Sequence, residues 1–283
     1  MTQTLLSIGH GFTAREFGTH VQNQGWQVIG TTRSNAKAQR LRDLGVEPIV
    51  WPGGNLNDAI HQATHILVSA APDENGDAFL NAYRDQVLSA THLKWIGYLS
   101  TTGVYGDHQG AWVDEDTPVV PTTKRGHHRA FAEQQWLATD LPIHVFRLAG
   151  IYGTGRGPFE KLRNGTARLV KKKGQVFGRI HVEDITQCLF ASAMSPNAGR
   201  IYNLSDDEPA APEDILTYAA TLLNMPAPPE VDFDTAEMSP MARSFYSECK
   251  RVRNDRLKDE LGITLKYPGY KDALDAMFRD ETA

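Results

Sequence analysis

Residues 9–14 read GHGFTA, a G-x-G-x-x-A pattern between an apolar run and a helix-like segment. The first glycine suits a tight turn out of a strand, the second lets the backbone approach a pyrophosphate, and the alanine permits close packing of helix on strand. The start of that helix offers unpaired N–H groups and the positive end of its dipole. The pattern predicts a dinucleotide-binding turn, with Gly9, Gly11, Phe12 and Thr13 against the phosphates.

Short strand-like runs alternate with helix-like stretches on both sides of this turn. The strand-like runs are 4–9, 26–32, 47–51, 65–70, 95–101, 143–149 and 200–206. The helix-like stretches are 12–24, 36–44, 78–91, 130–138 and the segment after Ile180. Such alternation is typical of a parallel sheet covered on both faces. It predicts an α/β fold of the Rossmann type, a doubly wound parallel sheet, with Ser69, Ala70 and Ala71 ending the fourth strand beneath the cofactor.

The composition changes after residue 150. Glycine, proline and lysine gather in 151–178, and the region from 207 onward is rich in proline. We expect residues 1–150, completed by about 179–206, to form the dinucleotide-binding domain. Residues 151–178 and 207–283 are expected to form a smaller substrate-binding lobe.

Composition and charge exclude several other classes of protein. The chain has 283 residues, 41% of them hydrophobic and 22% charged, which is ordinary for a globular protein. Its net charge of −5 disfavours nucleic acid or an anionic membrane as a partner. No signal peptide or spanning segment is visible. The two cysteines, Cys188 and Cys249, have no metal-like spacing, so we expect a cytoplasmic protein without a metal.

The end of the second strand bears on the choice between NAD and NADP. An NAD site usually places an acid there, for the ribose 2′-hydroxyl. The stretch 26–42 has no acid but contains Arg33, Lys37, Arg40 and Arg42. A guanidinium can hold a 2′-phosphate through two charge-assisted hydrogen bonds, so Arg33 predicts NADP(H), with NAD the weaker candidate. The alternative is that these cations form a solvated helix face, which we expect for Lys37 and Arg40.

Several further segments carry a resemblance to a known superfamily. They are STTGVYGDHQGAWVDEDTPVVP at 100–121, RLAGIYGTGRG at 147–157, GRIHVEDI at 178–185, RIYNLSDDEP at 200–209 and RNDRLKDELGITLKYPGY at 253–270. With the glycine turn, they resemble the extended and atypical short-chain dehydrogenases/reductases, the NAD-dependent epimerase/dehydratase-like group. The resemblance covers nearly the whole chain and implies a Rossmann core with substrate held against a C-terminal lobe. It also implies that the hydroxyl of Thr101 binds the reacting oxygen of the substrate.

The catalytic pair of that superfamily is missing. Its proton donor is a tyrosine paired with a lysine four residues later, and counting back from Glu133 places these positions at Arg125 and Arg129. Arginine stays protonated, so it cannot act as a general acid and base. Arg129 could still hold the ribose. Arg125 could bind an anionic group of a substrate or pair with a carboxylate such as Asp114 or Glu115.

Three other residues are candidates for proton transfer: Tyr105, His127 and His128. A histidine has a suitable pKa near neutrality, although a lone helical histidine is more often exposed or structural. The diphosphate-binding arginine of nucleotide-sugar enzymes is replaced by Phe177, with Arg179 two residues before His181. A nucleotide-sugar substrate is therefore unsupported. The basic residues of the following lobe are alternative anion ligands or simply solvated: Arg156, Lys161, Arg163 and Arg168. We expect His181 and Asp184 to hold the lobe junction.

Two functions remain open at this point. The first is an NADP(H)-dependent oxidoreductase or epimerase-like enzyme that acts on a small substrate, with anionic molecules among the candidates, and that is capable of forming a homodimer. The second is a non-catalytic sensor of the NADPH/NADP ratio. The arginine at the tyrosine position favours the sensor, whereas the intact cleft-lining segments at 103–112 and 150–159 favour the enzyme.

Overall fold

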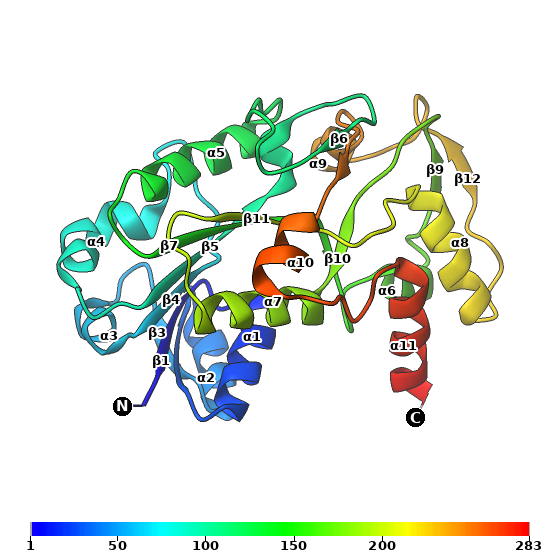
Figure 1. The fold of residues 1–283 in the computed structure, drawn as a ribbon. Coiled ribbons are helices and arrows are strands. Elements are labelled where there is room, and N and C mark those ends of the chain that lie inside the picture. Colours follow the sequence, from blue (N-terminus) through cyan, green and yellow to red (C-terminus); the bar gives the residue numbers. More distant parts are fainter. Residues whose placement is uncertain (1, 283) are drawn as a thin grey trace.

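A seven-stranded parallel sheet forms the centre of the computed structural model, which describes residues 2–282 (Figure 1). Its strands are β1 (Thr4–Ile8), β2 (Gln27–Thr32), β3 (Glu47–Val50), β4 (His65–Val68), β5 (Trp95–Thr101), β7 (Ile143–Leu148) and β11 (Ile201–Leu204). All seven coincide with predicted strands. They run in the order β11-β7-β5-β4-β1-β2-β3, and every neighbouring pair is parallel. The predicted Rossmann-type α/β fold is confirmed.

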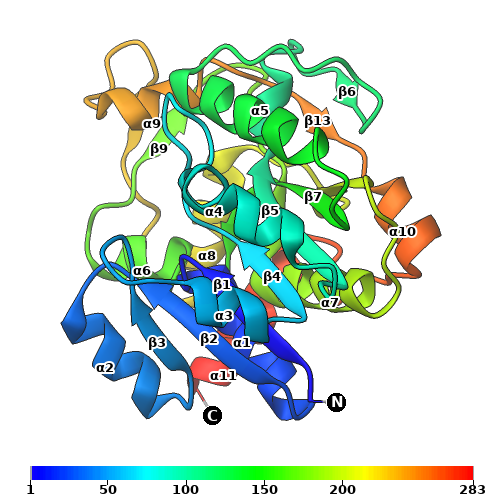
Figure 2. The same ribbon diagram turned by 90° about the vertical axis from the view of Figure 1, so that its left-hand side faces the viewer.

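Helices cover both faces of the sheet (Figures 1 and 2). One face packs against α1 (Phe12–Asn23), α2 (Asn35–Asp43) and α7 (Val182–Met194). The other packs against α3 (Asn57–Gln62), α4 (Ala78–Ser89) and α5 (Lys124–Leu137). Each layer has its own hydrophobic core, because a strand buried on both faces presents apolar side chains to both. In β5, Trp95 belongs to the first core and Ile96 to the second.

The strand order creates the crevice in which such folds place a ligand. The chain proceeds outward from β1 to β2 and β3, and then returns to place β4 on the other side of β1. The connections therefore leave in opposite directions at the carboxyl ends of β1 and β4. Ligands of open α/β sheets bind at this switch point. The glycine turn, which directly follows β1, lies there.

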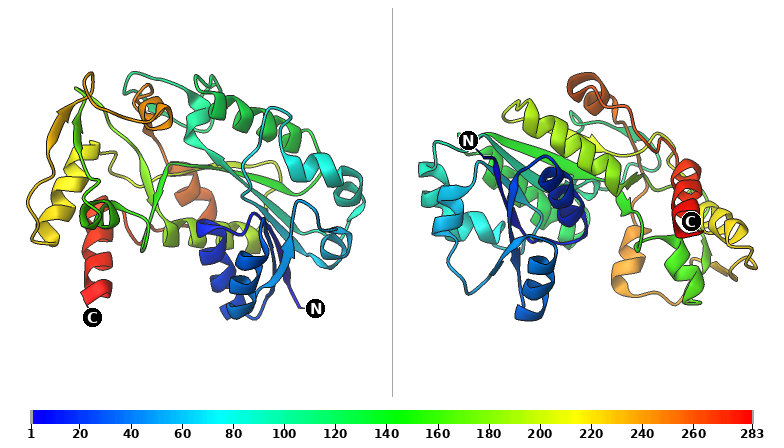
Figure 3. Two further views of the ribbon diagram at one scale, coloured as in Figure 1. Left: turned by 180° about the vertical axis from the view of Figure 1, so that it is seen from behind. Right: turned by 90° about the horizontal axis from the view of Figure 1, so that it is seen from below.

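The remaining elements lie outside the central sheet. They are the 3₁₀ helix η1 (Thr102–Tyr105), β6 (Trp112–Val113), β8 (Gly150–Tyr152), α6 (Pro158–Arg163), β9 (Leu169–Lys171), β10 (Arg179–His181), α8 (Pro212–Leu222), β12 (Glu230–Asp232), α9 (Pro240–Phe245), β13 (Arg251–Val252), α10 (Asp255–Leu261) and α11 (Tyr270–Thr282). A third hydrophobic cluster joins α6, α8 and α11, which stand beside the sheet and not on either face (Figure 3). The domain boundaries drawn from the sequence stay a prediction. Within residues 2–282, every helix is too short or too polar to cross a membrane.

Candidate functional site

The glycine turn closes tightly against its neighbours. Gly9 has a φ of +80°, and a Cβ on it would lie 2.9 Å from the backbone nitrogen of Ala70. Its N–H donates to the hydroxyl oxygen of Thr31 at 2.7 Å, and the N–H of His10 donates to the carbonyl of Thr31 at 3.0 Å. The turn is therefore fixed to β2 on one side and to the segment after β4 on the other. Only glycine meets both the backbone angle and the close approach.

The first turn of α1 is suited to an anion. Its N-cap residue is Gly11, so no side chain accepts from the free N–H groups, and no acid stands in the first turn. Apart from one backbone oxygen at 3.7 Å, nothing lies within 4 Å of a Cβ built on Gly11. Phe12 is half-buried and Thr13 is buried in the same turn. The uncapped N–H groups and the space beside Gly11 fit the diphosphate of a dinucleotide.

Arg33 directly follows β2, on the same edge of the sheet as the glycine turn. Its side chain is exposed, and among residues 2–282 no carboxylate lies within ion-pairing distance of it. Lys37 and Arg40, on the following helix, are exposed as well. The guanidinium of Arg33 is therefore available to an external anion at the tip of β2.

The segment Ser69–Ala71 lies beside the turn, although not within the strand. The prediction that these residues end the fourth strand was wrong by a small margin, because β4 stops at Val68. There the chain bends toward Ile8, whose carbonyl accepts the N–H groups of Ser69 at 2.9 Å and Ala70 at 3.1 Å. The Ser69 hydroxyl also donates to the carbonyl of Gly9. This exit from β4 supports the turn.

Thr101 and Arg129 both lie at the carboxyl end of β5. The Thr101 hydroxyl is half-buried and accepts the N–H of Gly103 at 3.1 Å, which leaves its proton free to donate. One nitrogen of Arg129 donates to the carbonyl of Leu99 at 2.6 Å and to that of Ala70 at 3.4 Å. Arg129 therefore spans the ends of β4 and β5, and its proposed contact with a ribose stays a prediction.

Tyr105 does not suit the proton-transfer role that the sequence suggested. Its ring is fully buried, and its hydroxyl donates to Asn203 at 2.7 Å and accepts from Arg147 at 3.0 Å. Arg147 forms a buried ion pair with Glu133 at 2.8 Å, and Glu133 in turn accepts the hydroxyl of Ser100. Burial raises the pKa of Tyr105 to about 12. The 3₁₀ helix turns this ring inward, so it joins a structural network and not the cleft.

Arg125 lies at the start of α5 without an acidic partner. The suggested pairing with Asp114 or Glu115 is wrong: Asp114 accepts from Thr117, and Glu115 accepts the N–H of Asn203. Instead, the guanidinium carbon of Arg125 lies 4.6 Å from the ring centroid of Phe245 in α9. Partial burial and then the charge of Arg129 lower the pKa of Arg125.

The two histidines of α5 differ in exposure. His127 is exposed, whereas His128 is half-buried. Because residues three and four apart share a helix face, Arg125 shares a face of α5 with His128 and also with Arg129. The position of His128 therefore remains compatible with proton transfer, whereas His127 faces away from this group.

One of the four basic residues beyond β8 reaches the glycine turn. The guanidinium carbon of Arg156 lies 5.2 Å from the ring centroid of Phe12, at the start of α1. Arg163 pairs with Glu281, and Arg168 donates to the carbonyls of Gly165 and Ala167. Lys161 is exposed on α6. The segment after β8 therefore places one cation beside the predicted phosphate site.

As expected, His181 and Asp184 connect α7 and the residue before it with the segment before α11. The Asp184 carboxylate accepts the N–H groups of Lys266 at 2.7 Å and Tyr267 at 3.1 Å, which ties α7 to the segment before α11. The ring of His181 lies 4.3 Å from that of Tyr267. Burial lowers the pKa of His181 to about 4.

Sequence analysis missed two buried titratable groups at this edge. His10, the second residue of the turn, packs between α1 and β2, and burial lowers its pKa to about 4. Asp206, just after β11, is 1% exposed, and neither carboxylate oxygen accepts a hydrogen bond. Burial raises the pKa of Asp206 to about 8. The chain offers no local signal for either, because both environments depend on elements distant in sequence.

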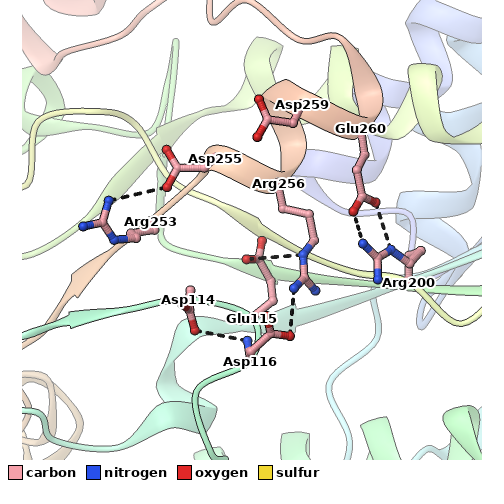
Figure 4. Close-up of a pocket in the computed structure, with 9 residues that line it drawn as sticks. All are labelled: Asp114, Glu115, Asp116, Arg200, Arg253, Asp255, Arg256, Asp259 and Glu260. Atoms are coloured by element: carbon pink, nitrogen blue, oxygen red, sulfur yellow. Dashed lines mark hydrogen bonds and ion pairs between the residues drawn. The ribbon is translucent and has the colours of Figure 1, made fainter.

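A separate hollow of about 290 Å³ lies between the segment after β6 and α10 (Figure 4). Its arginines are occupied by its own acids: Arg256 bonds to Asp116 at 2.8 Å, and Arg200 pairs with Glu260. We interpret it as a surface ion-pair cluster. Neither here nor elsewhere in residues 2–282 is a group of three or more His, Cys, Asp or Glu side chains placed to hold a metal ion.

Comparison with known proteins agrees with this architecture. No family model matches the chain. Protein YeeZ of Escherichia coli (strain K12) is 29% identical over 279 residues, which cover 92% of this chain and 95% of that protein. Among solved structures, UDP-glucuronic acid 4-epimerase from Bacillus cereus, in complex with UDP-glucuronic acid and NAD, has a TM-score of 0.77 at 16% identity. That match covers 99% of this chain and 100% of the epimerase, and it shows the fold alone.

A much more similar solved structure is a functionally unknown conserved protein from Silicibacter pomeroyi DSS. It is 56% identical to this chain, with a TM-score of 0.94 over 99% of both chains. The epimerase shares the fold over its whole length. The chain therefore belongs to the same family as the conserved protein from Silicibacter pomeroyi, within the fold of the epimerase and dehydratase type.

Proposed function

We propose that this protein is an NADP(H)-dependent oxidoreductase or epimerase-like enzyme acting on a small substrate. The observation that carries the proposal is the uncapped start of α1 behind Gly9 and Gly11, with Arg33 free at the tip of the neighbouring strand. The NAD complex of the B. cereus epimerase, which has the same fold, supports a nicotinamide dinucleotide as the ligand.

The residues at the turn fit such a cofactor. The N–H groups of the first turn of α1 would bind the diphosphate, and Arg156 would add a positive charge beside it. Arg33 would bind the 2′-phosphate in two charge-assisted hydrogen bonds, an arrangement that a carboxylate at this place would oppose. The free guanidinium of Arg33 and the lack of an acid in 26–42 favour NADP over NAD.

At the other end of the cofactor, the side chains of β5 and α5 would orient the substrate. A nicotinamide ring supplies hydride transfer when it is bound. The Thr101 hydroxyl would donate a hydrogen bond to the reacting oxygen, and the remaining N–H groups of Arg129 would hold the ribose. His128 is the side chain that this face offers for proton transfer.

Binding of the two dinucleotides to matched variants tests the proposal. We expect NADPH to bind more tightly than NADH in a fluorescence titration. Arg33→Ala should weaken NADPH binding by about 1–3 kcal/mol and leave NADH binding unchanged, because only NADPH carries the phosphate. Arg40→Ala removes an equally exposed arginine from α2 and should change neither affinity. Equal affinity of the wild type for NADPH and NADH contradicts the assignment of Arg33.

Activity separates the enzyme from the sensor. NADPH absorbance during a screen of carbonyl compounds should reveal turnover that Thr101→Ala reduces. The protein is a sensor if it binds NADPH without turnover and if its affinity for a partner protein differs between the reduced and the oxidised cofactor.

A further inference from the structure

A cavity of about 600 Å³ lies between the start of α5 and α9. Figure 2 shows α9 at one end of α5. Nine residues line it, among them Lys124, Arg125, Pro240, Met241 and Arg243. Its walls combine side chains of two segments more than a hundred residues apart in the sequence.

The charges of this cavity are all positive. Lys124, Arg125 and Arg243 line it, and no lining residue is an acid. Arg243 is held in place by the carbonyl of Ala236, to which it donates at 2.7 Å. Because that acceptor is neutral, the charge of Arg243 remains uncompensated there. Three cations around one hollow repel one another unless an anion enters.

The acid nearest to Arg125 is occupied elsewhere. Glu248 is the carboxylate whose charge acts on Arg125, and its two oxygens accept from the Thr122 hydroxyl at 2.6 Å and from Lys250 at 2.7 Å. The face of Arg125 is covered by the ring of Phe245, which fixes the plane of the guanidinium. Within the described part of the chain, its edge N–H groups, which bind carboxylate and phosphate in a fork, have no hydrogen-bond partner.

The cavity is next to the site of the proposed chemistry. Arg125 stands one helical turn before Arg129, whose guanidinium reaches the carboxyl ends of β4 and β5. The following residue, Gly126, lies so close to η1 that a Cβ on it would approach the carbonyl oxygen of Gly103 to 2.9 Å. The η1 helix begins immediately after Thr101. The start of α5 therefore contacts both the cavity and the η1 helix that follows Thr101.

Building on the proposed function, we propose that the cavity between α5 and α9 binds the carboxylate or phosphate group of an anionic substrate, with Arg125 as its principal ligand. Lys124 and Arg243 supply additional charge, and Pro240 and Met241 supply an apolar wall for the carbon skeleton. Binding pockets for small organic molecules commonly combine such a wall with a few polar groups. The arginine at the superfamily's tyrosine position is thus a substrate anchor and not an acid.

Anion titration tests this assignment on the whole protein. Inorganic phosphate and succinate are titrated separately into wild-type protein by isothermal calorimetry, with and without saturating NADPH, in 150 mM chloride. We expect saturable binding of at least one anion, and Arg125→Ala should weaken it at least tenfold. Tighter binding of phosphate indicates a phosphorylated substrate, and tighter binding of succinate indicates a carboxylic acid.

Two further variants keep the result interpretable. Arg84→Ala removes an exposed arginine from α4 and should leave anion binding unchanged. Met241→Glu introduces a carboxylate at a side chain that is 65% exposed, so folding should be preserved while anion binding is lost. This second variant gives the answer even if Arg125→Ala fails to fold.

The outcomes separate this inference from the proposed function. NADPH affinity should be the same in wild type, Arg125→Ala and Met241→Glu, because the cavity lies outside the cofactor turn. Absence of saturable anion binding by the wild type, or binding that survives both substitutions, overturns the anion site while NADPH binding still stands. Failure of the wild type to bind NADPH overturns the proposed function, and the titration without NADPH then decides the anion site alone.

Discussion

At the scale of the residue, the glycine turn could be predicted from the sequence more directly than the environments of the candidate catalytic side chains. The G-x-G-x-x-A spacing specifies a backbone shape, and the structure has that shape at Gly9 and Gly11. The environments of side chains are not specified in this way. Tyr105 is four residues from Thr101 along the chain, yet its hydroxyl bonds to Asn203 and Arg147 inside the fold. Contacts that form across 40 to 100 residues leave no pattern in one sequence.

Exchange of Gly9 for alanine should show what the tight turn contributes. Gly9 and Gly25 have nearly the same backbone angle, φ +80° and +81°, so alanine pays a similar conformational cost of about 1 kcal/mol at either position. Only at Gly9 would the new methyl group meet a neighbour, at 2.9 Å from the nitrogen of Ala70; nothing lies within 4 Å at Gly25. We expect Gly9→Ala to lower the free energy of unfolding by about 1–3 kcal/mol more than Gly25→Ala.

Urea unfolding measures this difference, and NADPH titration measures its effect on the site. The displaced turn in Gly9→Ala should bind NADPH more weakly, whereas Gly25→Ala should bind it as the wild type does. Equal stability and equal affinity of the two variants would show that the contact with Ala70 is unimportant.

At the scale of the element, the seven strands of the sheet could be predicted and the short elements could not. A strand buried on both faces is a largely apolar run, which marks β1, β4 and β5 plainly and β7 in spite of its histidine and arginine. The α5 helix begins at Lys124, six residues before the predicted start, because its first two turns are polar and lack an apolar period. The six-residue helix α3 was not predicted, since one and a half turns are too short to show a period.

The start of α5 supports a prediction about how closely this helix packs against η1. Alanine favours a helix over glycine by about 1 kcal/mol, so Gly126→Ala should stabilise an isolated helix. In the folded protein, the added Cβ would lie 2.9 Å from the carbonyl oxygen of Gly103 and 3.0 Å from Pro121. Since a backbone carbonyl cannot move without moving η1, we expect a net loss of about 1–3 kcal/mol.

The neighbouring residue provides the control. His127 is exposed on the same helical turn, and His127→Ala should change the free energy of unfolding by no more than about 0.5 kcal/mol. Urea midpoints of both variants give the comparison. A higher midpoint for Gly126→Ala than for the wild type would mean that η1 and α5 are not closely packed.

At the scale of the whole molecule, buried titratable groups couple stability to pH in two opposite directions. Burial lowers the pKa of His10, His65, His144 and His181 to about 4, from an ordinary value of 6.5. Below pH 6.5 the unfolded chain therefore binds protons that the folded chain does not, and stability falls as the pH falls toward 4. Burial raises the pKa of Asp206 from 3.8 to about 8, so the folded chain keeps a proton that the unfolded chain has released. Asp206 therefore makes stability fall as the pH rises toward 8.

Asp206→Asn isolates the second of these effects. Asparagine cannot ionise, so the variant should gain stability relative to the wild type as the pH rises from 4 to 8, by up to about 1.4 kcal/mol per pH unit, and gain no more above pH 8. Burial of the amide costs the same free energy at every pH. It therefore shifts the curve of the stability difference against pH without changing its slope. Neither oxygen of Asp206 accepts a hydrogen bond that the exchange could break. Urea unfolding of both proteins at half-unit pH intervals measures the curve, and a difference independent of pH would show that Asp206 is ionised in the folded protein, with Arg179 compensating its charge.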